Sequence, residues 1–408
     1  MSAPGVLAGL RVVEGSAFIA APLGGMTLAQ LGADVIRFDQ IGGGLEYGRW
    51  PLAPDGQSLF WAGMNKGKRS IQLDLRAPAG QELAGALVTA PGDDGGLFLT
   101  NFPPRGWLDP ARLTAARPDL VMVVISGNAD GSSEVDYTVN PATGFPLATG
   151  PRGLAEPVNS LLPAWDIACG NLAAVGLLAG ERKRRLTGAG SVIPLALSDV
   201  AFAMAGHMGR IAQAHLGEGN PAKGGNYLYG AYGNDLGTRD GRRVMVVGLT
   251  ARQWSSLVQA TGTAEAFAAL AEREGHDFES EGGRYLARET ITEVLSPWFA
   301  ARDLGEVEAA LGGTGVAYGV YRTFEQMLDE DDRVSVDSAL FEGVHHPGVG
   351  AYLMPGSPLR FPDGGTPPPV RAPQLGEHTD QILAGVLGLS AAEIGRLHDQ
   401  GVVAGPTG

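Results

Sequence analysis

Alternating strand-like and helix-like segments in the first half of the chain place the strongest constraint on its fold. The strand-like segments are short and apolar, and they lie at residues 10–14, 33–39, 70–74, 97–100 and 120–126. Helical patterns separate them at about residues 22–31, 80–90 and 110–116. Strands that alternate with helices form a mainly parallel sheet covered on both faces. We therefore predict an α/β fold with a large Rossmann-like domain.

Two longer helices are predicted in the middle of the chain. One covers residues 166–185, carries basic residues in its last turns, where they suit the helix dipole, and ends at Gly188. Ser198 is predicted to cap a second helix that runs to about His215. A smaller α/β unit then follows, with strands at residues 244–249 and 316–321, a helix capped by Thr250, and helices at 284–302 and 304–311.

Composition and charge exclude several classes of function. The formal net charge is −14, whereas a nucleic-acid-binding surface is basic, so no nucleic acid is expected as a partner. Lys66, Lys68 and Arg69 form either a small anion-binding patch or a solvated turn. The single cysteine, Cys169, excludes a disulfide framework and a cysteine-rich zinc site. With no signal-peptide pattern and no bilayer-spanning apolar run, we expect a cytoplasmic protein with no membrane partner.

A nucleotide-binding enzyme is one alternative for the opening strand and helix. Asp39 ends the second strand 24 residues after Gly15, about where a dinucleotide fold places its ribose-binding carboxylate. The turn from Glu14 to Ile19 lacks the G-x-G-x-x-G glycines, which makes a dehydrogenase the weaker interpretation. The seven histidines form no metal-binding set, so no metal site is predicted.

Asp166 is the carboxylate that local physics favours most. It follows Pro163-Ala164-Trp165 and opens the long helix, where unpaired backbone N–H groups and the helix dipole favour an anion. A nucleophile has to be ionised, so this position suits covalent catalysis. The alternative is a carboxylate that only stabilises the start of the helix.

Several segments, in order along the chain, resemble the family III CoA-transferases of the formyl-CoA and carnitine type. They are residues 31–39, 65–75, 100–106, 178–190, 195–200, 346–347 and 376–380. The resemblance implies that Asp166 is the nucleophile that carries acyl and CoA groups. It also implies no cofactor or metal, because CoA is part of the substrate.

The resemblance further suggests residues that contact CoA. They are Ile19, Ala20, Gln40, Leu73, Arg76, Asn101 and Phe102. Formyl-CoA transferases have a polar residue at the position of Ile19 and an arginine at that of Gln40. We therefore expect Arg37, or Arg105 on a nearby loop, to replace the missing charge.

Residues 12–18, 133–141 and 225–232 are similar to family members that move CoA within one C5 diacid. The implied reaction takes CoA from the C1 to the C4 carboxyl of 2-methylfumaryl-CoA (mesaconyl-CoA), a step of the 3-hydroxypropionate CO2-fixation bicycle. The loop at residues 224–230 contains Tyr227, Leu228 and Tyr229, which suit a closed pocket. The alternatives are an intermolecular transferase acting on dicarboxylic acids and a non-catalytic CoA- or nucleotide-binding protein.

The family resemblance also implies an interlocked homodimer, in which each chain threads the other. The expected domains are a large CoA-binding domain at residues 1–216, a linker at 217–241 and a small domain at 242–330. Residues 331–408 are expected to return to the large domain.

Overall fold

The computed structural model describes residues 5–217, 219–362 and 365–406. The chain divides into two compact units. The first comprises Met1–Thr143, Ser160–Ala212 and Asp332–Gly408, and the second comprises Gly144–Asn159 and Gln213–Asp331. The expected small domain at residues 242–330 falls within the second unit. The stretch at 217–241 is not all linker, because its second half contains a strand, β7 (Tyr232–Gly237).

A seven-stranded sheet forms the centre of the first unit, in the order β12-β3-β2-β1-β4-β5-β6. Its strands are β1 (Arg11–Gly15), β2 (Asp34–Gln40), β3 (Arg69–Leu73), β4 (Leu97–Thr100), β5 (Val121–Ser126), β6 (Ser191–Ala196) and β12 (Val403–Ala404). β12 is antiparallel to β3, and the other pairs are parallel. This order, 3-2-1-4-5-6, is that of doubly wound nucleotide-binding sheets. The predicted α/β class is confirmed.

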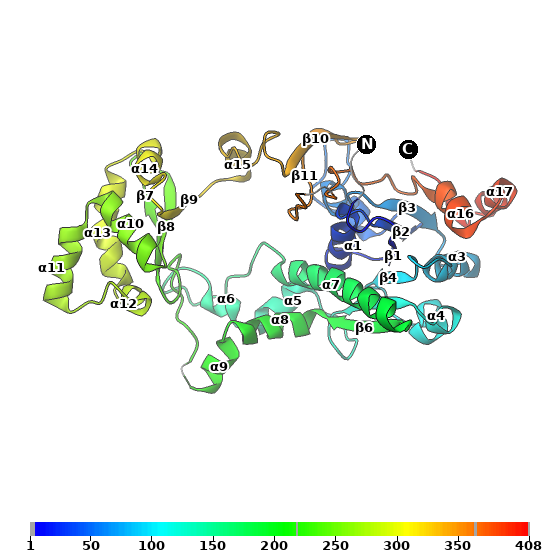
Figure 1. The fold of residues 1–408 in the computed structure, drawn as a ribbon, viewed down its shortest axis with the longest axis horizontal. Helices are drawn as coiled ribbons and strands as arrows, with labels where there is room; N and C mark the ends of the chain where they lie inside the picture. The colour runs from blue at the N-terminus through cyan, green and yellow to red at the C-terminus, as the bar shows by residue number, and fades with distance from the viewer. Residues whose placement is uncertain (1–4, 218, 363–364, 407–408) are drawn as a thin grey trace. The chain divides into compact units, whose positions relative to one another are not determined.

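Successive residues of each strand point to opposite faces of this sheet, and helices cover both faces (Figure 1). Val12 belongs to the core shared with α1 (Ala20–Gln30), α7 (Ala164–Thr187) and α8 (Leu197–His207). Val13 belongs to the core on the other face. The helices there are α3 (Pro78–Thr89), α4 (Pro110–Ala116), α16 (Thr379–Leu387) and α17 (Ala391–Asp399).

Two glycines bring α1 and α7 into close contact. A Cβ atom on Gly170 would lie 2.5 Å from the carbonyl oxygen of Ala20, and one on Gly24 would lie 2.9 Å from that of Gly170. Any side chain at Gly170 would therefore push the two backbones apart. The contact fixes the first turns of α7 beside the first turn of α1.

The predicted helix from Ser198 to about His215 differs from the structure in two ways. α8 begins at Leu197 and its N-cap is Ala196, so Ser198 is not the cap. The helix also stops at His207, and α9 (Arg210–His215) follows. Gly209, with φ +74°, lies at the break, where a left-handed residue ends helical hydrogen bonding.

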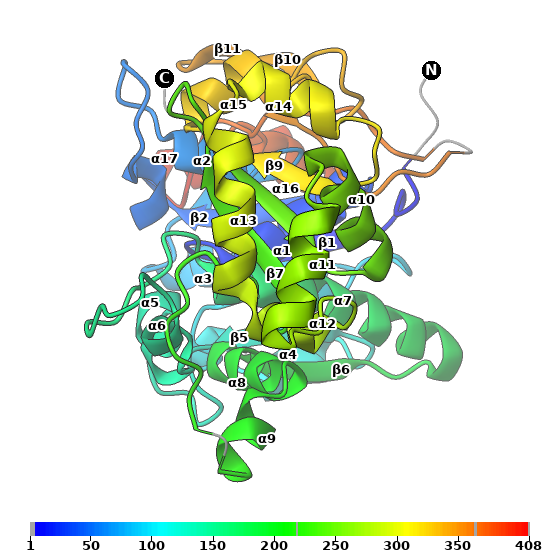
Figure 2. The same cartoon turned by 90° about the vertical axis from the view of Figure 1, so that its left-hand side faces the viewer.

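The second unit contains an antiparallel sheet, β7-β8-β9, covered by helices (Figure 2). Its elements are α6 (Phe145–Ala148), β8 (Arg243–Gly248), α10 (Ala251–Thr261), α11 (Ala264–Glu274), α12 (Glu281–Leu286), α13 (Arg288–Ala300), α14 (Leu304–Leu311), β9 (Ala317–Val320) and α15 (Phe324–Glu330). The predicted cap Thr250 accepts a hydrogen bond from the Gln253 N–H at 3.2 Å. Trp254, Ile291 and Phe299 lie in the hydrophobic core of the second unit.

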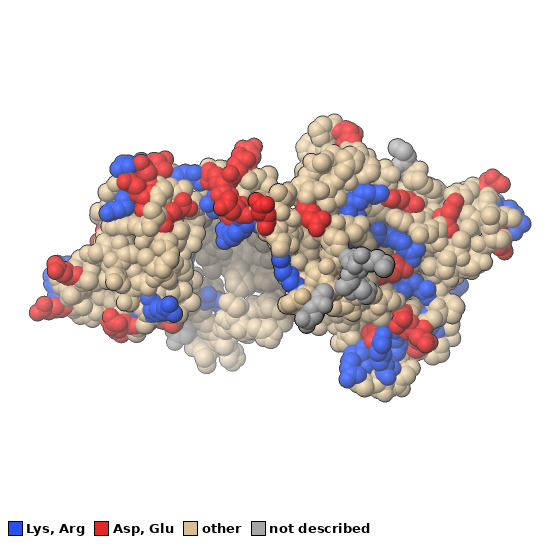
Figure 3. Space-filling model, turned by 45° about the horizontal axis from the view of Figure 1, so that its top comes forward, with Lys and Arg blue, Asp and Glu red and all other residues tan. Residues whose placement is uncertain are grey.

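The remaining elements of the first unit are short. They are η1 (Leu45–Gly48), α2 (Leu59–Met64), η2 (Gly106–Leu108), α5 (Asp136–Ala142), β10 (Phe341–His346) and β11 (Gly350–Pro355). Among the helices in the described ranges, none is long and apolar enough to cross a bilayer. Acidic and basic side chains are interspersed on the face drawn in Figure 3, a pattern unlike the continuous basic surface that binds nucleic acid.

Candidate active site

The candidate site lies in the first unit, where the strand order reverses between β1 and β4. The carboxyl ends of these neighbouring strands meet at Gly15 and Thr100, and ligands of doubly wound sheets bind at such a switch point. The two following loops are joined, because the Ala17 N–H donates to Asn101 Oδ1 at 2.9 Å and Asn101 Nδ2 donates to the Ala17 carbonyl at 2.8 Å. The amide of Asn101 therefore fixes the geometry of this edge.

Gly15 is explained by packing at the same edge. A Cβ atom there would lie 2.2 Å from the Phe38 ring, so only glycine lets β1 pass this ring without displacing it. Phe38 in turn packs against Phe102, one of the predicted CoA contacts, with ring centroids 6.2 Å apart.

Most of the predicted CoA contacts gather at this carboxyl edge. Ile19 and Ala20 follow β1, Gln40 ends β2, Leu73 and Arg76 are at and after the end of β3, and Asn101, Phe102 and Arg105 follow β4. Arg76 and Arg105 are exposed, so their guanidinium groups are accessible to phosphate oxygens. Gln40 is engaged locally, since its Nε2 donates to Asp74 Oδ1 at 3.2 Å and its Oε1 accepts from the Leu75 N–H at 2.9 Å.

Arg37 does not fit the predicted role of replacing a CoA-binding charge. Its side chain is 1% exposed, and its guanidinium contacts the carboxylates of Glu14, Asp39 and Glu46. It also donates to Ser16 Oγ at 3.0 Å. All of its polar hydrogens point into the protein, so Arg37 is a structural residue, and Arg105 remains as the proposed replacement.

The run from Lys66 to Arg69 is neither a surface basic patch nor a solvated turn. The Lys68 ammonium is buried and donates to Glu14 Oε1 at 2.8 Å, and the Lys66 ammonium donates to the Pro355 carbonyl at 2.9 Å. Arg69 pairs with Asp34. Asp39 is likewise buried against Arg37, which removes the ribose-binding carboxylate that the dehydrogenase alternative requires.

Asp166 lies in the first turn of α7 and is partly buried. It precedes Gly170 by one turn on the same helical face, and Gly170 lies against the Ala20 carbonyl. The contact between α1 and α7 therefore places Asp166 beside the loop that follows β1. Cys169 is buried, and burial raises the pKa of its thiol to about 12, so a thiolate nucleophile is excluded near neutral pH.

Asp136 occupies the backbone amides that were expected to stabilise the Asp166 anion. One oxygen of Asp136, Oδ2, accepts hydrogen bonds from the N–H groups of Trp165 at 2.8 Å and Asp166 at 3.1 Å. Burial, and then the negative charge of Asp136, raise the pKa of Asp166 to about 6, while the positive charge of Arg49 lowers it. The pKa of Asp166 is therefore raised at this helix start, but a group with a pKa of about 6 is still mostly ionised at pH 7, as a nucleophile has to be.

Arg49 and Asp136 are the charged residues near Asp166 that sequence reasoning missed. Arg49 follows η1, and its guanidinium carbon lies 5.6 Å from the centre of the Phe18 ring and 5.3 Å from that of Phe60. Phe18 is the one non-glycine residue of the described chain with a positive φ, +64°, and such backbone strain clusters at functional sites. No periodic pattern in the sequence marks either residue.

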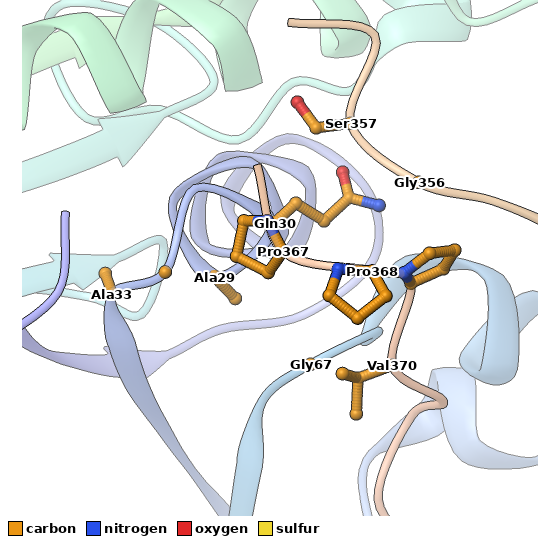
Figure 4. A pocket seen from close by; sticks show the side chains of 11 residues that line it. Ala29, Gln30, Ala33, Gly67, Gly356, Ser357, Pro367, Pro368 and Val370 are labelled. Atoms are coloured by element: carbon orange, nitrogen blue, oxygen red, sulfur yellow. The ribbon is translucent and has the colours of Figure 1, made fainter. Parts of the chain in front are cut away.

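The pocket in Figure 4 lies elsewhere in the first unit and is a poor site for this chemistry. It has a volume of about 220 Å³ and is lined by residues that include Gln30, Ala33, Gly67 and Pro368. Ala33 and Gly67 precede β2 and β3, so the pocket is at the amino edge of the sheet, opposite Asp166. Its described lining contains no charged side chain. Metal-binding clusters of three or more His, Cys, Asp or Glu are likewise absent from the described ranges.

The raised pKa of Asp166 predicts a pH titration that can be observed directly. We expect the ¹³C signal of its carboxyl group to titrate near pH 6, close to the pKa of about 6. In Asp136→Asn the amide oxygen can still accept the α7 N–H groups, but the like charge is gone. The pKa of Asp166 then falls, because its ionised form is no longer repelled. Asp136→Glu keeps the charge and should keep the pKa raised; equal values in the two variants would rule out this cause.

Sequence comparison agrees with the class of protein that this fold and site define. The model of CoA-transferase family III matches residues 7–379, and the chain belongs to this family. The resemblance seen in the sequence is thereby confirmed. The 2-methylfumaryl-CoA isomerase of Chloroflexus aurantiacus is 57% identical over 403 residues, which cover 98% of each chain.

More distant relatives share the whole length of the chain. The succinyl-CoA–D-citramalate CoA-transferase of Chloroflexus aurantiacus is 27% identical, with 98% of each chain covered. The solved structure of a CAIB/BAIF family protein from Brucella suis superposes with a TM-score of 0.77 at 24% identity, over 94% of this chain and 100% of that chain. This likeness supports the fold.

Proposed function

We propose that this chain moves CoA from the C1 to the C4 carboxyl of 2-methylfumaryl-CoA, with Asp166 as the nucleophile. The observation that carries the proposal is the position of Asp166, partly buried in the first turn of α7, which the contact between Gly170 and Ala20 places beside the loop after β1 and its predicted CoA contacts. The identity of 57% to a 2-methylfumaryl-CoA isomerase over nearly the full length supports this substrate.

In the first half-reaction, a carboxylate oxygen of Asp166 attacks the C1 carbonyl of the thioester. The C–S bond breaks, CoA leaves as a thiolate, and a mixed anhydride joins Asp166 to the diacid. The thiolate then attacks the aspartyl carbonyl, which releases the C1 carboxylate and leaves an aspartyl-CoA thioester.

The second half-reaction reverses these steps at the other end of the diacid. The C4 carboxylate attacks the aspartyl thioester, CoA leaves again as a thiolate, and a second anhydride forms. Attack of the thiolate on the C4 carbonyl gives the product and restores the Asp166 carboxylate. No proton is consumed, and retaining the diacid makes the second half effectively unimolecular. Water has to be excluded, because it would hydrolyse either anhydride.

An exchange experiment tests this proposal against its main alternative. The enzyme is incubated with 2-methylfumaryl-CoA carrying CoA at C1, together with ¹³C-labelled free 2-methylfumarate, and the C4 isomer is analysed by mass spectrometry. We expect the C4 isomer to form with almost no label. Heavy labelling would instead identify an intermolecular transferase, and CoA binding with no isomer and no hydroxylamine-sensitive adduct would identify a non-catalytic binding protein.

The same family likeness supports proposals about assembly. We infer an interlocked homodimer in which residues 331–408 return to a large CoA-binding domain. Apolar side chains are exposed on α7 and α8, among them Val175 and Phe202, and such side chains are suited to an interface between subunits. The proposed mechanism uses no cofactor besides the CoA of its substrate, and we propose that the protein acts in the cytoplasm.

A further inference from the structure

We propose that Arg49 binds the substrate carboxylate that is not reacting, and thereby selects CoA thioesters of diacids. This inference rests on the proposed function and adds the group that recognises the far end of the substrate.

The Arg49 guanidinium lies close to two aromatic rings and has no carboxylate partner among the described residues. Its carbon lies 5.6 Å from the centre of the Phe18 ring and 5.3 Å from that of Phe60, distances typical of cation–π contacts. The residue is exposed. Within the described chain, no carboxylate forms an ion pair with it at 4.0 Å or less, Asp166 included. A cation that is positioned but not paired can receive an anion.

The backbone around Arg49 is fixed at several points. The Arg49 N–H donates to the Glu46 carbonyl at 3.2 Å, and the Arg49 carbonyl accepts from Ser58 Oγ at 2.6 Å. Glu46 is itself held by the buried Arg37. Phe18, which contacts Arg49, is held at φ +64° next to the hydrogen bonds between Ala17 and Asn101. A rigid setting of this kind positions a guanidinium for a ligand at little entropic cost.

The negative charges that would gather around Asp166 favour a cation at this position. Asp136 lies close enough to raise the pKa of Asp166, and the free carboxylate of a diacid thioester would add a third negative charge. Arg49 is the positive group that lowers this pKa, so it is within electrostatic reach of the reacting carboxylate. Arg76 and Arg105 lie after β3 and β4, at positions predicted to contact CoA. A guanidinium binds a carboxylate through two parallel hydrogen bonds.

The two half-reactions use this contact in turn. While Asp166 reacts at C1, Arg49 holds the C4 carboxylate. While Asp166 reacts at C4, Arg49 holds the C1 carboxylate. The same contact therefore serves both half-reactions, and it slows release of the free diacid in the interval between the first and the second.

Arg49→Gln tests the proposal by comparing two substrates. The first is 2-methylfumaryl-CoA, followed as isomer formation. The second is crotonyl-CoA, a monocarboxylic thioester, followed as CoA release with hydroxylamine present, with Asp166→Ala as the blank. We expect kcat/KM for the diacid thioester to fall about 100-fold or more, as when one partner of a desolvated charge pair is removed. The rate with crotonyl-CoA should change less than about 3-fold, because that substrate has no carboxylate for Arg49 to bind.

Further variants make the result decisive. Arg49→Lys keeps the positive charge but cannot form two parallel hydrogen bonds to a carboxylate. Its kcat/KM for the diacid thioester should lie between those of wild type and Arg49→Gln. Arg112 is an exposed arginine on α4, and the control variant Arg112→Gln should match wild type with both substrates.

Label from free 2-methylfumarate should enter the product more readily in Arg49→Gln than in wild type. Equal losses with both substrates, or no loss with the diacid, would overturn the role of Arg49. If wild-type enzyme failed to isomerise 2-methylfumaryl-CoA, the proposed function itself would be wrong.

Discussion

Asp166→Ala is expected to lower kcat/KM for 2-methylfumaryl-CoA by about 10,000-fold or more, because the substitution removes the carboxylate that carries the acyl group and CoA in the proposed mechanism. Asp166 lies at the start of α7, beside the loop after β1, and has a pKa of about 6. At neutral pH it is therefore an ionised carboxylate that is partly shielded from water. Such a carboxylate is less solvated than one at the surface and attacks a thioester more readily.

The measurement should separate a nucleophile from a helix-stabilising carboxylate. Isomer formation is followed by liquid chromatography, and the covalent adduct by mass spectrometry after hydroxylamine treatment, which should convert the Asp166 side chain to a hydroxamate. Asp109 supplies a matched control, because it caps α4 by accepting the Ala111 N–H at 2.8 Å. Asp109→Asn should leave both readings unchanged. Full turnover by Asp166→Ala would remove Asp166 from the mechanism.

Arg37→Ala is expected to destabilise the first unit by about 3–5 kcal/mol, the usual cost of removing one partner from a buried ion pair. Arg37 is 1% exposed, and Glu14, Asp39 and Glu46 surround it. Removing the guanidinium leaves these three buried carboxylates with only the Lys68 ammonium, which contacts Glu14. Uncompensated buried charge is costly because the interior cannot solvate it.

Urea unfolding followed by tryptophan fluorescence measures this loss, because Arg37 lies 4.6 Å from the centre of the Trp61 ring. If Arg37→Ala does not accumulate in cells, Arg37→Lys can be measured in its place. Lysine keeps one positive charge but lacks the planar guanidinium and its parallel N–H donors, so the free energy of unfolding should drop by less. Arg112→Ala, on the exposed face of α4, should stay within about 0.5 kcal/mol of wild type. Unchanged stability together with a raised KM for the CoA thioester would restore Arg37 as a ligand contact.

The local sequence predicted the strands β1 to β5 and several of the helices that cover them, but not how these elements are used. The strand at Leu97–Thr100 and the helix at Pro110–Ala116 were predicted with the bounds that the structure has, since each is bordered by strong turn or capping signals. β6 (Ser191–Ala196) was missed, and its last residue caps α8. An edge strand with alternating burial and a proline at its centre carries little strand signal.

The candidate site shows the same division between local and long-range information. The place of Asp166 in the first turn of a long helix could be predicted, because it follows a recognisable run and precedes a family-like segment, while its role as the nucleophile stays a prediction. Its pKa could not, because Asp136, 30 residues earlier in the chain, takes the N–H groups at the start of α7. Arg37 was predicted to face the ligand, but the register of β2 turns it toward Glu14 and Glu46 instead. In both cases residues from other elements, Asp136 for Asp166 and Glu14 for Arg37, decided the outcome.

During synthesis on the ribosome, the central sheet of the first unit is completed only when β12 emerges and pairs with β3. About 330 residues separate these strands, which corresponds to roughly 15–65 s of translation. Ile71 and Leu73 share their core with Ile382 and Val403, so they await these partners while the second unit is being made. That unit ends at Asp331, before β12 is made. For this interval β3 is an edge strand of the sheet, because it is paired with β2 but not yet with β12, and its free edge is open to pairing with another chain.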